Sequence, residues 1–350
     1  MFFTRVVCGA CLVGLLVELA AAGRLLPAAT TDPRVLLKDI AGFTDADWAT
    51  VDAGGAVAKV IDSEPREIAV AGAVRIAATR EHLASRMREV ENLKLSAVVL
   101  DLGRFGRTPT PADLARAALE DYSLDLRGCR PGDCRVRLTA SDIGRFHQEI
   151  DWRAADARAR AARIWREVLA RHVAAYVSEG RKALPVYANR GEPLSVAAEL
   201  STLVSRFAFV AGYSPELHAY LQEFGPGLPQ GAEDVVYWTK EDFGVRPVLR
   251  ISHQVLLPPS GARPVLVATN QVYADHYMDA ALGVTIAVDA PGAAGKRAFY
   301  MIAVNRARTR SLSGILRRMI RGTVQSRSRE AMRKILTATK TALEASQGRS

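Results

Sequence analysis

The sequence predicts an α+β fold in which a curved antiparallel sheet is gripped by one long C-terminal helix, with a large all-helical insertion. Three observations support this prediction. Runs of alternating apolar residues occur near 54–102 and again over 235–304, the stretch between them has helical spacing, and the chain ends in one long amphipathic segment. The 350 residues are 49% hydrophobic and 24% charged, which is typical of a globular protein and excludes a collagenous or wholly disordered chain.

Residues 1–22 have the three parts of a secretory signal peptide. Arg5 supplies the positive charge, Val6–Val17 form the apolar region, and small residues lead up to Ala22. We therefore expect an exported protein, periplasmic or associated with the envelope, that is cleaved after Ala22. An uncleaved anchor is the alternative, although the apolar run is short for a membrane span and Glu18 interrupts it.

The next segment, 23–50, contains two prolines and is expected to be a linker with a short helix. Period-two runs then predict strands, and Thr79 is placed to cap a helix whose apolar residues have helical spacing. These first elements are strands at 56–61, 67–77 and 95–102 and a helix at 79–91.

Residues 109–232 lack β-branched runs and are rich in Ala, Arg, Leu and Glu, which favours helices. Strand patterns return at 235, separated by Pro- and Gly-containing turns, and the last element is one amphipathic helix. The expected helices are 113–120, 141–150, 152–178, 195–210, 214–224 and 312–345, and the expected strands are 235–239, 246–257, 264–273, 282–289 and 297–304.

Cys129 and Cys134 enclose Arg-Pro-Gly-Asp. Because Pro-Gly favours a turn, the two Cα atoms can approach the distance that a disulfide needs, and an oxidising compartment would preserve the bond. A zinc half-site or a redox pair are the alternatives. The nearest histidine, His147, stands alone, and a redox pair is more typically C-x-x-C.

The positive charge is concentrated at the C-terminal end. Residues 306–350 contain 12 Lys and Arg against two Glu, which equals the whole net charge of +10. Such a segment in an exported protein suggests contact with an anionic membrane surface, and a solvated helix face is the alternative. No nucleic-acid-binding motif is present, so nucleic acid is not expected as a partner.

The order of these elements resembles the START-like, or helix-grip, superfamily of lipid and steroid transfer domains, polyketide cyclases and plant allergens. The resemblance is carried by EIAVAGAVRIAATREHLASRMREV (67–90), similar to its opening strand and helix, and by VTIAVDAPGAAGKRAFYMIAVNRARTRSLSGILRRMIRG (284–322), similar to its closing strands and grip helix. The resemblance implies a ligand cavity between sheet and helix. The predicted domains are a signal peptide (1–22), a linker (23–50), a START-like domain (51–108 plus 233–346) and a helical insertion or lid beside the cavity mouth (109–232).

Candidate ligand-binding residues lie on the predicted strands. His253 falls on an apolar strand face, where it is either a satisfied core residue or a partner for the polar head of a ligand. Tyr273 and Tyr277 share a predicted face with two aspartates, while His276 points the other way. The remaining candidates are the pair Tyr237 and Trp238, which are core or aperture lining, and Arg306, which is an anion clamp or a surface residue.

The sequence contains few motifs for catalysis, cofactor binding or metal binding. No G-x-S-x-G, G-x-G-x-x-G or P-loop motif is found, so no catalytic residue or cofactor is assigned. Strand alternation separates the acidic and histidine residues near 275–279, so no metal site is assigned either. The leading hypothesis is an exported binding or carrier protein for a hydrophobic or amphipathic small molecule, such as a lipid. An envelope interaction protein without a ligand, and a cyclase- or hydrolase-like enzyme using the same cavity, are the alternatives.

Overall fold

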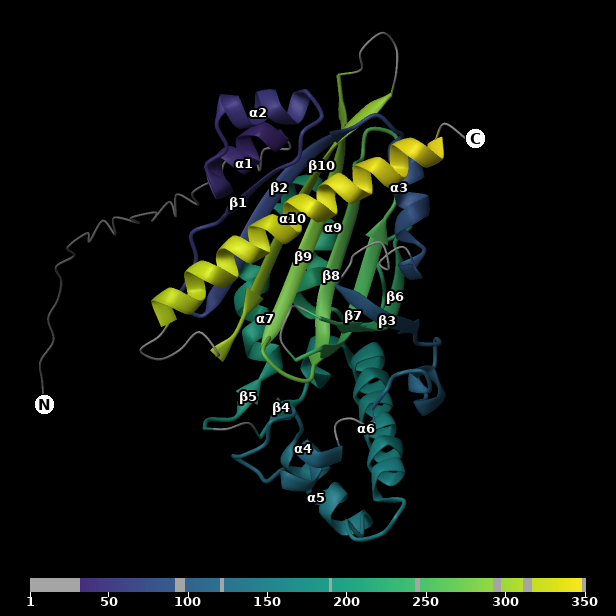
Figure 1. Cartoon of the computed structure of the whole chain (residues 1–350). Helices are drawn as coiled ribbons and strands as arrows, with labels where there is room; N and C mark the ends of the chain where they lie inside the picture. The colour runs from purple at the N-terminus through teal and green to yellow at the C-terminus, as the bar shows by residue number, and fades with distance from the viewer. Residues whose placement is uncertain are drawn as a thin grey trace, which may run out of the picture.

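A computed structural model describes residues 32–91, 98–119, 123–188, 191–242, 246–291, 297–310 and 317–347. Its centre is an eight-stranded antiparallel sheet with the order β1-β2-β10-β9-β8-β7-β6-β3 (Figure 1). The strands are β1 (Val57–Val60), β2 (Glu67–Ile76), β3 (Val99–Arg104), β6 (Glu233–Glu241), β7 (Val248–Leu257), β8 (Val265–Ala274), β9 (Ala280–Ala290) and β10 (Ala298–Arg308).

Helices surround this sheet, and a second, two-stranded sheet joins β4 (Val186–Tyr187) to β5 (Leu194–Ser195). The α-helices are α1 (Pro33–Ala41), α2 (Asp45–Asp52), α3 (Arg80–Met87), α4 (Ser123–Gly128), α5 (Ala140–Glu149), α6 (Ala157–Glu179), α7 (Val196–Val204), α8 (Val210–Tyr213), α9 (Pro215–Glu223) and α10 (Arg317–Gln347). The 3-10 turns are η2 (Pro111–Leu114), η4 (Gly180–Ala183) and η5 (Ser205–Phe207). The predicted α+β class, antiparallel sheet and long C-terminal helix are therefore confirmed.

The helix α10 crosses one face of the sheet over β1 and β2 (Figure 1). Its apolar stripe faces inward, with Met332, Leu336 and Leu343 buried. Gly72 of β2 lies beneath it, and a Cβ there would be 2.7 Å from Leu336 Cδ1 and 2.9 Å from the carbonyl oxygen of Val57. Only glycine therefore allows the helix to pack this closely against the strand.

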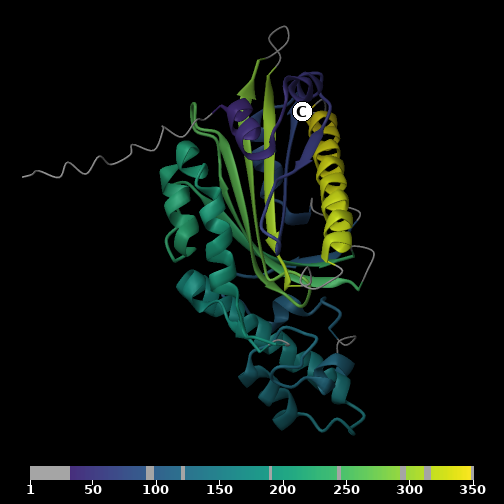
Figure 2. The same cartoon turned by 90° about the vertical axis from the view of Figure 1, so that its left-hand side faces the viewer.

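The opposite face of the sheet is covered by helices of the segment 109–232 and by α1 and α2, so the sheet lies between two helical layers (Figure 2). Strand alternation divides the core accordingly. In β10, Phe299 and Met301 belong to the apolar cluster under α10, whereas Ile302 and Val304 belong to the cluster under the other helices. The segment expected to be an insertion or lid supplies α7 and α9 to this second layer, whereas α4, α5 and the start of α6 extend beyond the end of the sheet (Figure 1).

Three local expectations differ from the structure. Within the expected linker, Pro33–Ala41 and Asp45–Asp52 form helices, because Asp32 and Thr44 cap their first turns and their apolar residues pack into the core. The strand expected at 95–102 begins at Val99, and residues 92–97 lie outside the described part of the chain. The helix expected at 113–120 is only the 3-10 turn Pro111–Leu114.

The junction of α5 and α6 holds a buried carboxylate that makes stability depend on pH. The side chain of Asp142 is 1% exposed and contacts His172 Nε2 at 3.1 Å, the guanidinium of Arg171 and the hydroxyl of Thr139. Burial alone would raise the pKa of Asp142, but the hydrogen bond and charge of His172, the Thr139 hydrogen bond and the charge of Arg171 outweigh it and lower the pKa to about 2.

We expect Asp142→Asn to lower the free energy of unfolding by about 2 kcal/mol at pH 7. Because the folded-state pKa lies below the model value of 3.8, this contribution is present above pH 4 and is lost as the pH falls through about 2. Urea denaturation of both proteins between pH 2 and pH 7 measures it. Parallel stability curves across that range would contradict the prediction.

Candidate functional site

His253 lies on the face of β7 that meets α6, and it is 4% exposed. Its Nδ1 is 2.9 Å from the hydroxyl of Tyr176, and its Nε2 is 3.0 Å from Oδ2 of Asp234. Asn270 Nδ2 donates to the same Tyr176 hydroxyl at 3.1 Å. Because the ionised carboxylate of Asp234 can only accept, Nε2 carries the proton of a neutral ring, and Nδ1 then accepts from the Tyr176 hydroxyl.

This chain of hydrogen bonds joins three strands to α6. Burial raises the pKa of Tyr176, and the hydrogen bond from His253 lowers the pKa of Asp234. Both ring nitrogens of His253 are occupied by protein groups, so the geometry favours the structural reading of this histidine. His253 does not lie between α10 and the sheet, where the helix-grip resemblance would place a ligand.

Trp238 lines a pocket of about 250 Å³ at the edge of the sheet formed by β3 and β6. Its Nε1 donates to the carbonyl oxygen of Asp113 at 2.9 Å, which fixes the indole in place. The ring lies across Gly103, where a Cβ would be 2.6 Å from Nε1. The lining is mainly apolar and comprises Leu100, Asp101, Arg116, Ala117, Ala118, Trp238, Lys240 and Leu249.

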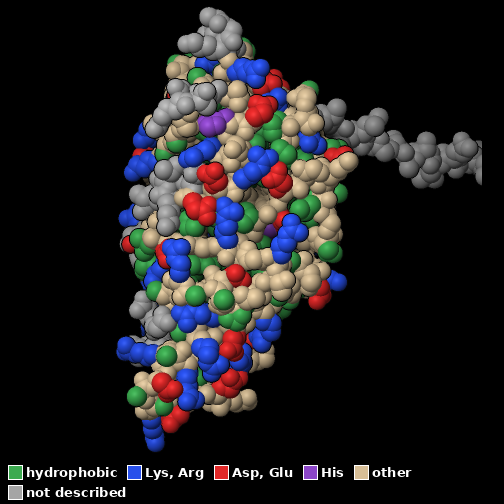
Figure 3. All heavy atoms as spheres, turned by 90° about the vertical axis from the view of Figure 1, so that its right-hand side faces the viewer, with side chains coloured by type: hydrophobic (Ala, Val, Ile, Leu, Met, Phe, Trp, Pro, Cys, Tyr) green, Lys and Arg blue, Asp and Glu red, His purple; other side chains and the backbone are tan. Residues whose placement is uncertain are grey.

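The rim of this sheet-edge pocket is charged. Arg116 Nη2 is 2.8 Å from Asp101 Oδ1, and both side chains are accessible to solvent. The side of the molecule where β3 and β6 lie carries positive and negative side chains interspersed rather than one sign of charge (Figure 3). A ligand with an apolar body and a polar end would match such a site.

Tyr237 precedes Trp238 and, because strand side chains alternate, points to the other face of the sheet. It is buried with Val90 and Leu102, and burial raises its pKa. Of the two adjacent aromatic candidates, only Trp238 reaches the sheet-edge pocket.

The turn between β8 and β9 does not continue the strand alternation expected for residues 273–279. The strand β8 ends at Ala274, and both Asp275 and Asp279 are buried, whereas Tyr277 is 38% exposed. Tyr277 has a φ of 61°, and the amide of Met278 donates to the carbonyl oxygen of His276 at 2.8 Å. A left-handed non-glycine residue inside a three-residue turn is strained backbone.

Asp275 is fully buried, and its Oδ1 is 2.6 Å from Nδ1 of His276. This is a short ion-pair distance, and neither carboxylate oxygen has a hydrogen-bond partner among the described residues. His276 Nε2 donates to the carbonyl oxygen of Arg246 at 3.5 Å, and the imidazole lies edge-on to the Tyr277 ring with centroids 4.3 Å apart. The guanidinium charge of Arg137 also acts on this carboxylate, so Asp275 is buried near a cation although its oxygens have no hydrogen bond.

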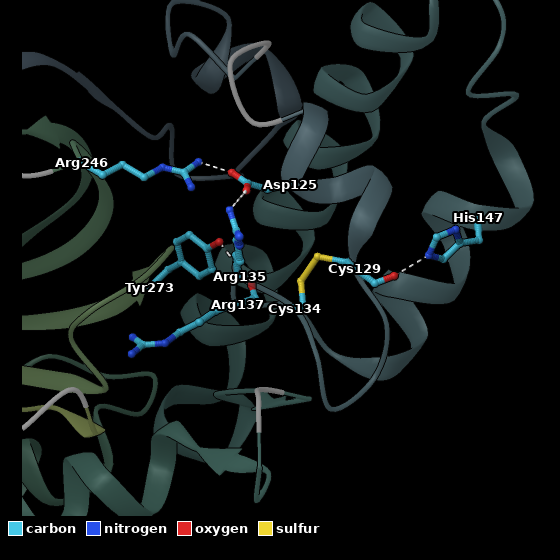
Figure 4. The surroundings of a disulfide bond; sticks show 8 residues. All are labelled: Asp125, Cys129, Cys134, Arg135, Arg137, His147, Arg246 and Tyr273. Atoms are coloured by element: carbon cyan, nitrogen blue, oxygen red, sulfur yellow. Dashed lines mark hydrogen bonds and ion pairs between the residues drawn. A yellow bond between two sulfur atoms is a disulfide. The ribbon is translucent and has the colours of Figure 1, made fainter. Parts of the chain in front are cut away.

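The predicted disulfide between Cys129 and Cys134 is confirmed, with Cα atoms 4.3 Å apart. It closes a hairpin whose exit leads Arg137 towards the β8–β9 turn (Figure 4). The Arg137 amide donates to the carbonyl oxygen of Asp275 at 3.0 Å, and its carbonyl oxygen accepts from the Tyr273 hydroxyl at 3.2 Å. Tyr273 is thus a buried support of this loop.

The Arg137 guanidinium makes a 2.6 Å ion pair with Asp279 Oδ1. Arg66 Nη2 contacts the other oxygen of Asp279 at 3.2 Å and Glu199 Oε1 at 2.7 Å. Burial raises the pKa of Asp279 even though Arg137 and Arg66 oppose it, and burial also lowers the pKa of Arg137. Desolvation therefore dominates both members of this pair.

Arg306 lies on β10 and pairs with Glu67 of β2 rather than with solvent. Both side chains are buried on the sheet face that meets the helical layer. A neighbouring arginine, Arg308, binds Glu199 and Glu64. The expected anion clamp is thus occupied by the carboxylates of the chain itself.

Comparison with known proteins gives little further information. No family model and no curated protein matches the chain. A distant structural neighbour is norcoclaurine synthase from Thalictrum flavum, in a structure with dopamine and hydroxybenzaldehyde. It is 13% identical, with 35% of this chain and 74% of that chain covered and a TM-score of 0.19, and this likeness carries no argument about function.

Among the described residues, no helix is both long and apolar enough to cross a bilayer. Within the same residues, no three His, Cys, Asp or Glu side chains are grouped so that they could hold a metal ion.

Proposed function

We propose that the protein binds a small amphipathic molecule in the sheet-edge pocket beside Trp238. The observation that carries this proposal is the pocket itself, a mainly apolar hollow with a charged rim and a hydrogen-bonded indole in its wall. Sites of this composition are typical of ligands whose apolar body is buried and whose polar end is oriented at the rim.

The proposed ligand is smaller than a complete lipid. A volume of about 250 Å³ is below the usual range of roughly 300–1,000 Å³ for drug-sized ligands, so the pocket suits a ring or a short chain. This moves the binding site away from the place that the helix-grip resemblance implies. Leu336 and Met332 of α10 lie directly on Gly72, so side chains fill the space between the helix and the strand there.

Membership of the START-like superfamily and export remain parts of this proposal. The element order and the helix across the sheet support the first. The disulfide supports the second, since such bonds persist in oxidising compartments. In this proposal the helical segment 109–232 is an insertion, and its first residues build one wall of the pocket.

The test combines native mass spectrometry with tryptophan fluorescence. We expect an extractable small molecule in the purified protein, or a fluorescence change on titration with short-chain amphiphiles that saturates at one site. Ala118→Phe should abolish either signal because the exposed Ala118 lies on the pocket wall, where a larger side chain fills it. Ala115→Phe is the matched control, since Ala115 is equally exposed on the same loop and does not line the pocket. Equal binding by the two variants would refute this site.

A second candidate function is peripheral docking to an anionic membrane through α10. The helix carries eight Lys and Arg against two Glu. Its apolar stripe is buried against the sheet while Arg327, Arg329, Arg333 and Lys334 are exposed. Any membrane contact of this helix would therefore be electrostatic, without insertion.

We expect Arg327→Gln with Lys334→Gln to weaken partitioning onto phosphatidylglycerol vesicles by about 20- to 30-fold at low salt, because each cation near such a surface contributes about 1 kcal/mol. Co-sedimentation of the protein with vesicles measures this. Neutralising Arg158, an exposed arginine of α6, is the control. Vesicle binding that stays the same at high salt, or that stays the same in the double variant, would exclude docking through α10.

A further inference from the structure

The lining of the sheet-edge pocket contains three charged side chains, Asp101, Arg116 and Lys240, which lie among apolar residues. Two of them are cations and one is an anion, so the lining itself carries a positive net charge. A small ligand held against this lining therefore meets more positive than negative charge, and the Coulomb interaction favours an anionic ligand.

The anion of the lining, Asp101, is already bound to groups of the chain. Its Oδ1 lies 2.8 Å from Arg116 Nη2 and accepts a hydrogen bond from the amide of Leu102, also at 2.8 Å. A ligand cation at this carboxylate would have to share it with the Arg116 guanidinium, and the two positive charges would repel each other. The contact between Asp101 and Arg116 thus disfavours a cationic ligand.

Arg116, in contrast, has donors to spare. A guanidinium carries several N–H groups, and within the described chain the Arg116 side chain contacts Asp101 alone, through Nη2. The side chain is 67% exposed, so its remaining N–H groups are open to solvent. The fork of an arginine matches a carboxylate, which can accept two parallel hydrogen bonds from it.

The indole of Trp238 determines where the apolar part of a ligand lies. Its Nε1 donates to the carbonyl oxygen of Asp113 at 2.9 Å, so the indole N–H is not available to a ligand. The ring therefore offers only apolar surface to the pocket. The polar group of a ligand that packs on this ring has to be satisfied elsewhere on the lining, where Arg116 supplies the free donors.

We propose that the sheet-edge pocket takes a monocarboxylate, a ring or short chain whose single carboxylate binds the Arg116 guanidinium; this inference rests on the binding function proposed above. The apolar part of the ligand packs against Trp238 and Ala118, and the carboxylate accepts two hydrogen bonds from Arg116. The charge of Asp101 remains at the rim, so a headgroup with two negative charges, such as a phosphate monoester, is repelled more strongly than a carboxylate.

The probes are 3-phenylpropanoate, 3-phenylpropan-1-ol and 3-phenylpropylamine, which share a ring and a chain and differ in charge. Isothermal titration calorimetry of the full chain at pH 7 and low salt measures their Kd values. We expect the carboxylate to bind at one site about tenfold more tightly than the alcohol, and the amine to bind most weakly.

Two substitutions at the rim should change the Kd of the carboxylate in opposite directions. Arg116→Gln should raise it about tenfold and leave the Kd of the alcohol unchanged, because the glutamine loses the charge and the fork. Asp101→Asn should lower it about threefold, because the amide oxygen can still accept from Leu102 while the repelling charge is gone. General damage to the rim would instead weaken the carboxylate and the alcohol alike in both variants.

Arg107→Gln is the matched control, since Arg107 is also exposed and does not line the pocket. It removes the same charge from the protein and should change the Kd of the carboxylate by less than about twofold. The assignment is wrong if the carboxylate binds no more tightly than the alcohol, or if Arg116→Gln weakens both equally. Either result would leave the pocket itself supported, provided that Ala118→Phe abolishes binding of the alcohol. If none of the three probes binds saturably, the pocket and the monocarboxylate both fail.

Discussion

Arg137→Met is expected to lower the free energy of unfolding by about 3–5 kcal/mol, among the largest effects of any single substitution in this chain. The Arg137 side chain is 7% exposed and its guanidinium is 2.6 Å from Asp279 Oδ1. Without it, Asp279 remains buried with Arg66 as its nearest cation, 3.2 Å from the other carboxylate oxygen. Urea denaturation followed by circular dichroism measures the difference.

The directions of the two pKa shifts lead to a second test of the Arg137–Asp279 pair. Burial lowers the pKa of Arg137 and raises that of Asp279, so desolvation costs each group more than their attraction returns. Arg137→Met with Asp279→Leu should therefore recover most of the stability that the single change loses. Arg135→Met, at an exposed position two residues earlier, should stay within about 0.5 kcal/mol of the natural sequence. A double variant no more stable than Arg137→Met would contradict this account.

The features that could be predicted from the sequence are those with local causes. Period-two alternation located the strands, because side chains of a half-buried strand point to opposite faces. The apolar stripe of 312–345 located α10, and Pro-Gly between Cys129 and Cys134 indicated the hairpin that brings the two sulfurs together.

The unpredicted features depend on partners far apart in the sequence. His253 meets Tyr176, 77 residues earlier, and Arg137 meets Asp279, 142 residues later, so no spacing rule connects either pair. Arg306 on its own resembled an anion clamp. Nothing local in the sequence indicates that Glu67, on the neighbouring strand β2, pairs with it. Tyr277 was misplaced because alternation is a rule for strands, and the strand ends three residues before it.

The same dependence on distant partners decides which face of the sheet the helical segment covers. The sequence of a strand that is apolar on both faces does not indicate which helices cover each face. In β9, Ile286 faces the helical layer and Ala287 faces the α10 side, and both are fully buried. Leu336 and Met332 fill the space between α10 and Gly72, and the pocket beside Trp238 lies at the sheet edge.

Leu336→Ala is expected to lower the free energy of unfolding by about 2–5 kcal/mol. Leu336 is fully buried against β2, and within the described part of α10 only Met332 and Leu343 join it as buried apolar side chains. Because so few side chains hold the helix, each of them contributes a large share of its packing free energy. Ile335→Ala, one residue earlier and 43% exposed, should cost little.

Hydrogen exchange distinguishes two ways in which this loss could act. If α10 is a separable layer, amides of α10 and β1 should exchange faster in Leu336→Ala while those of β7 and β8, which are buried between their neighbours, keep their protection. If the helix completes one cooperative core, protection should fall across the whole sheet. The close fit of Leu336 on Gly72 favours the cooperative result, because removing the leucine leaves a cavity directly over a strand that pairs with both β1 and β10. If the β10 amides of Leu336→Ala are as well protected as those of the unaltered protein, the sheet is stable without the helix.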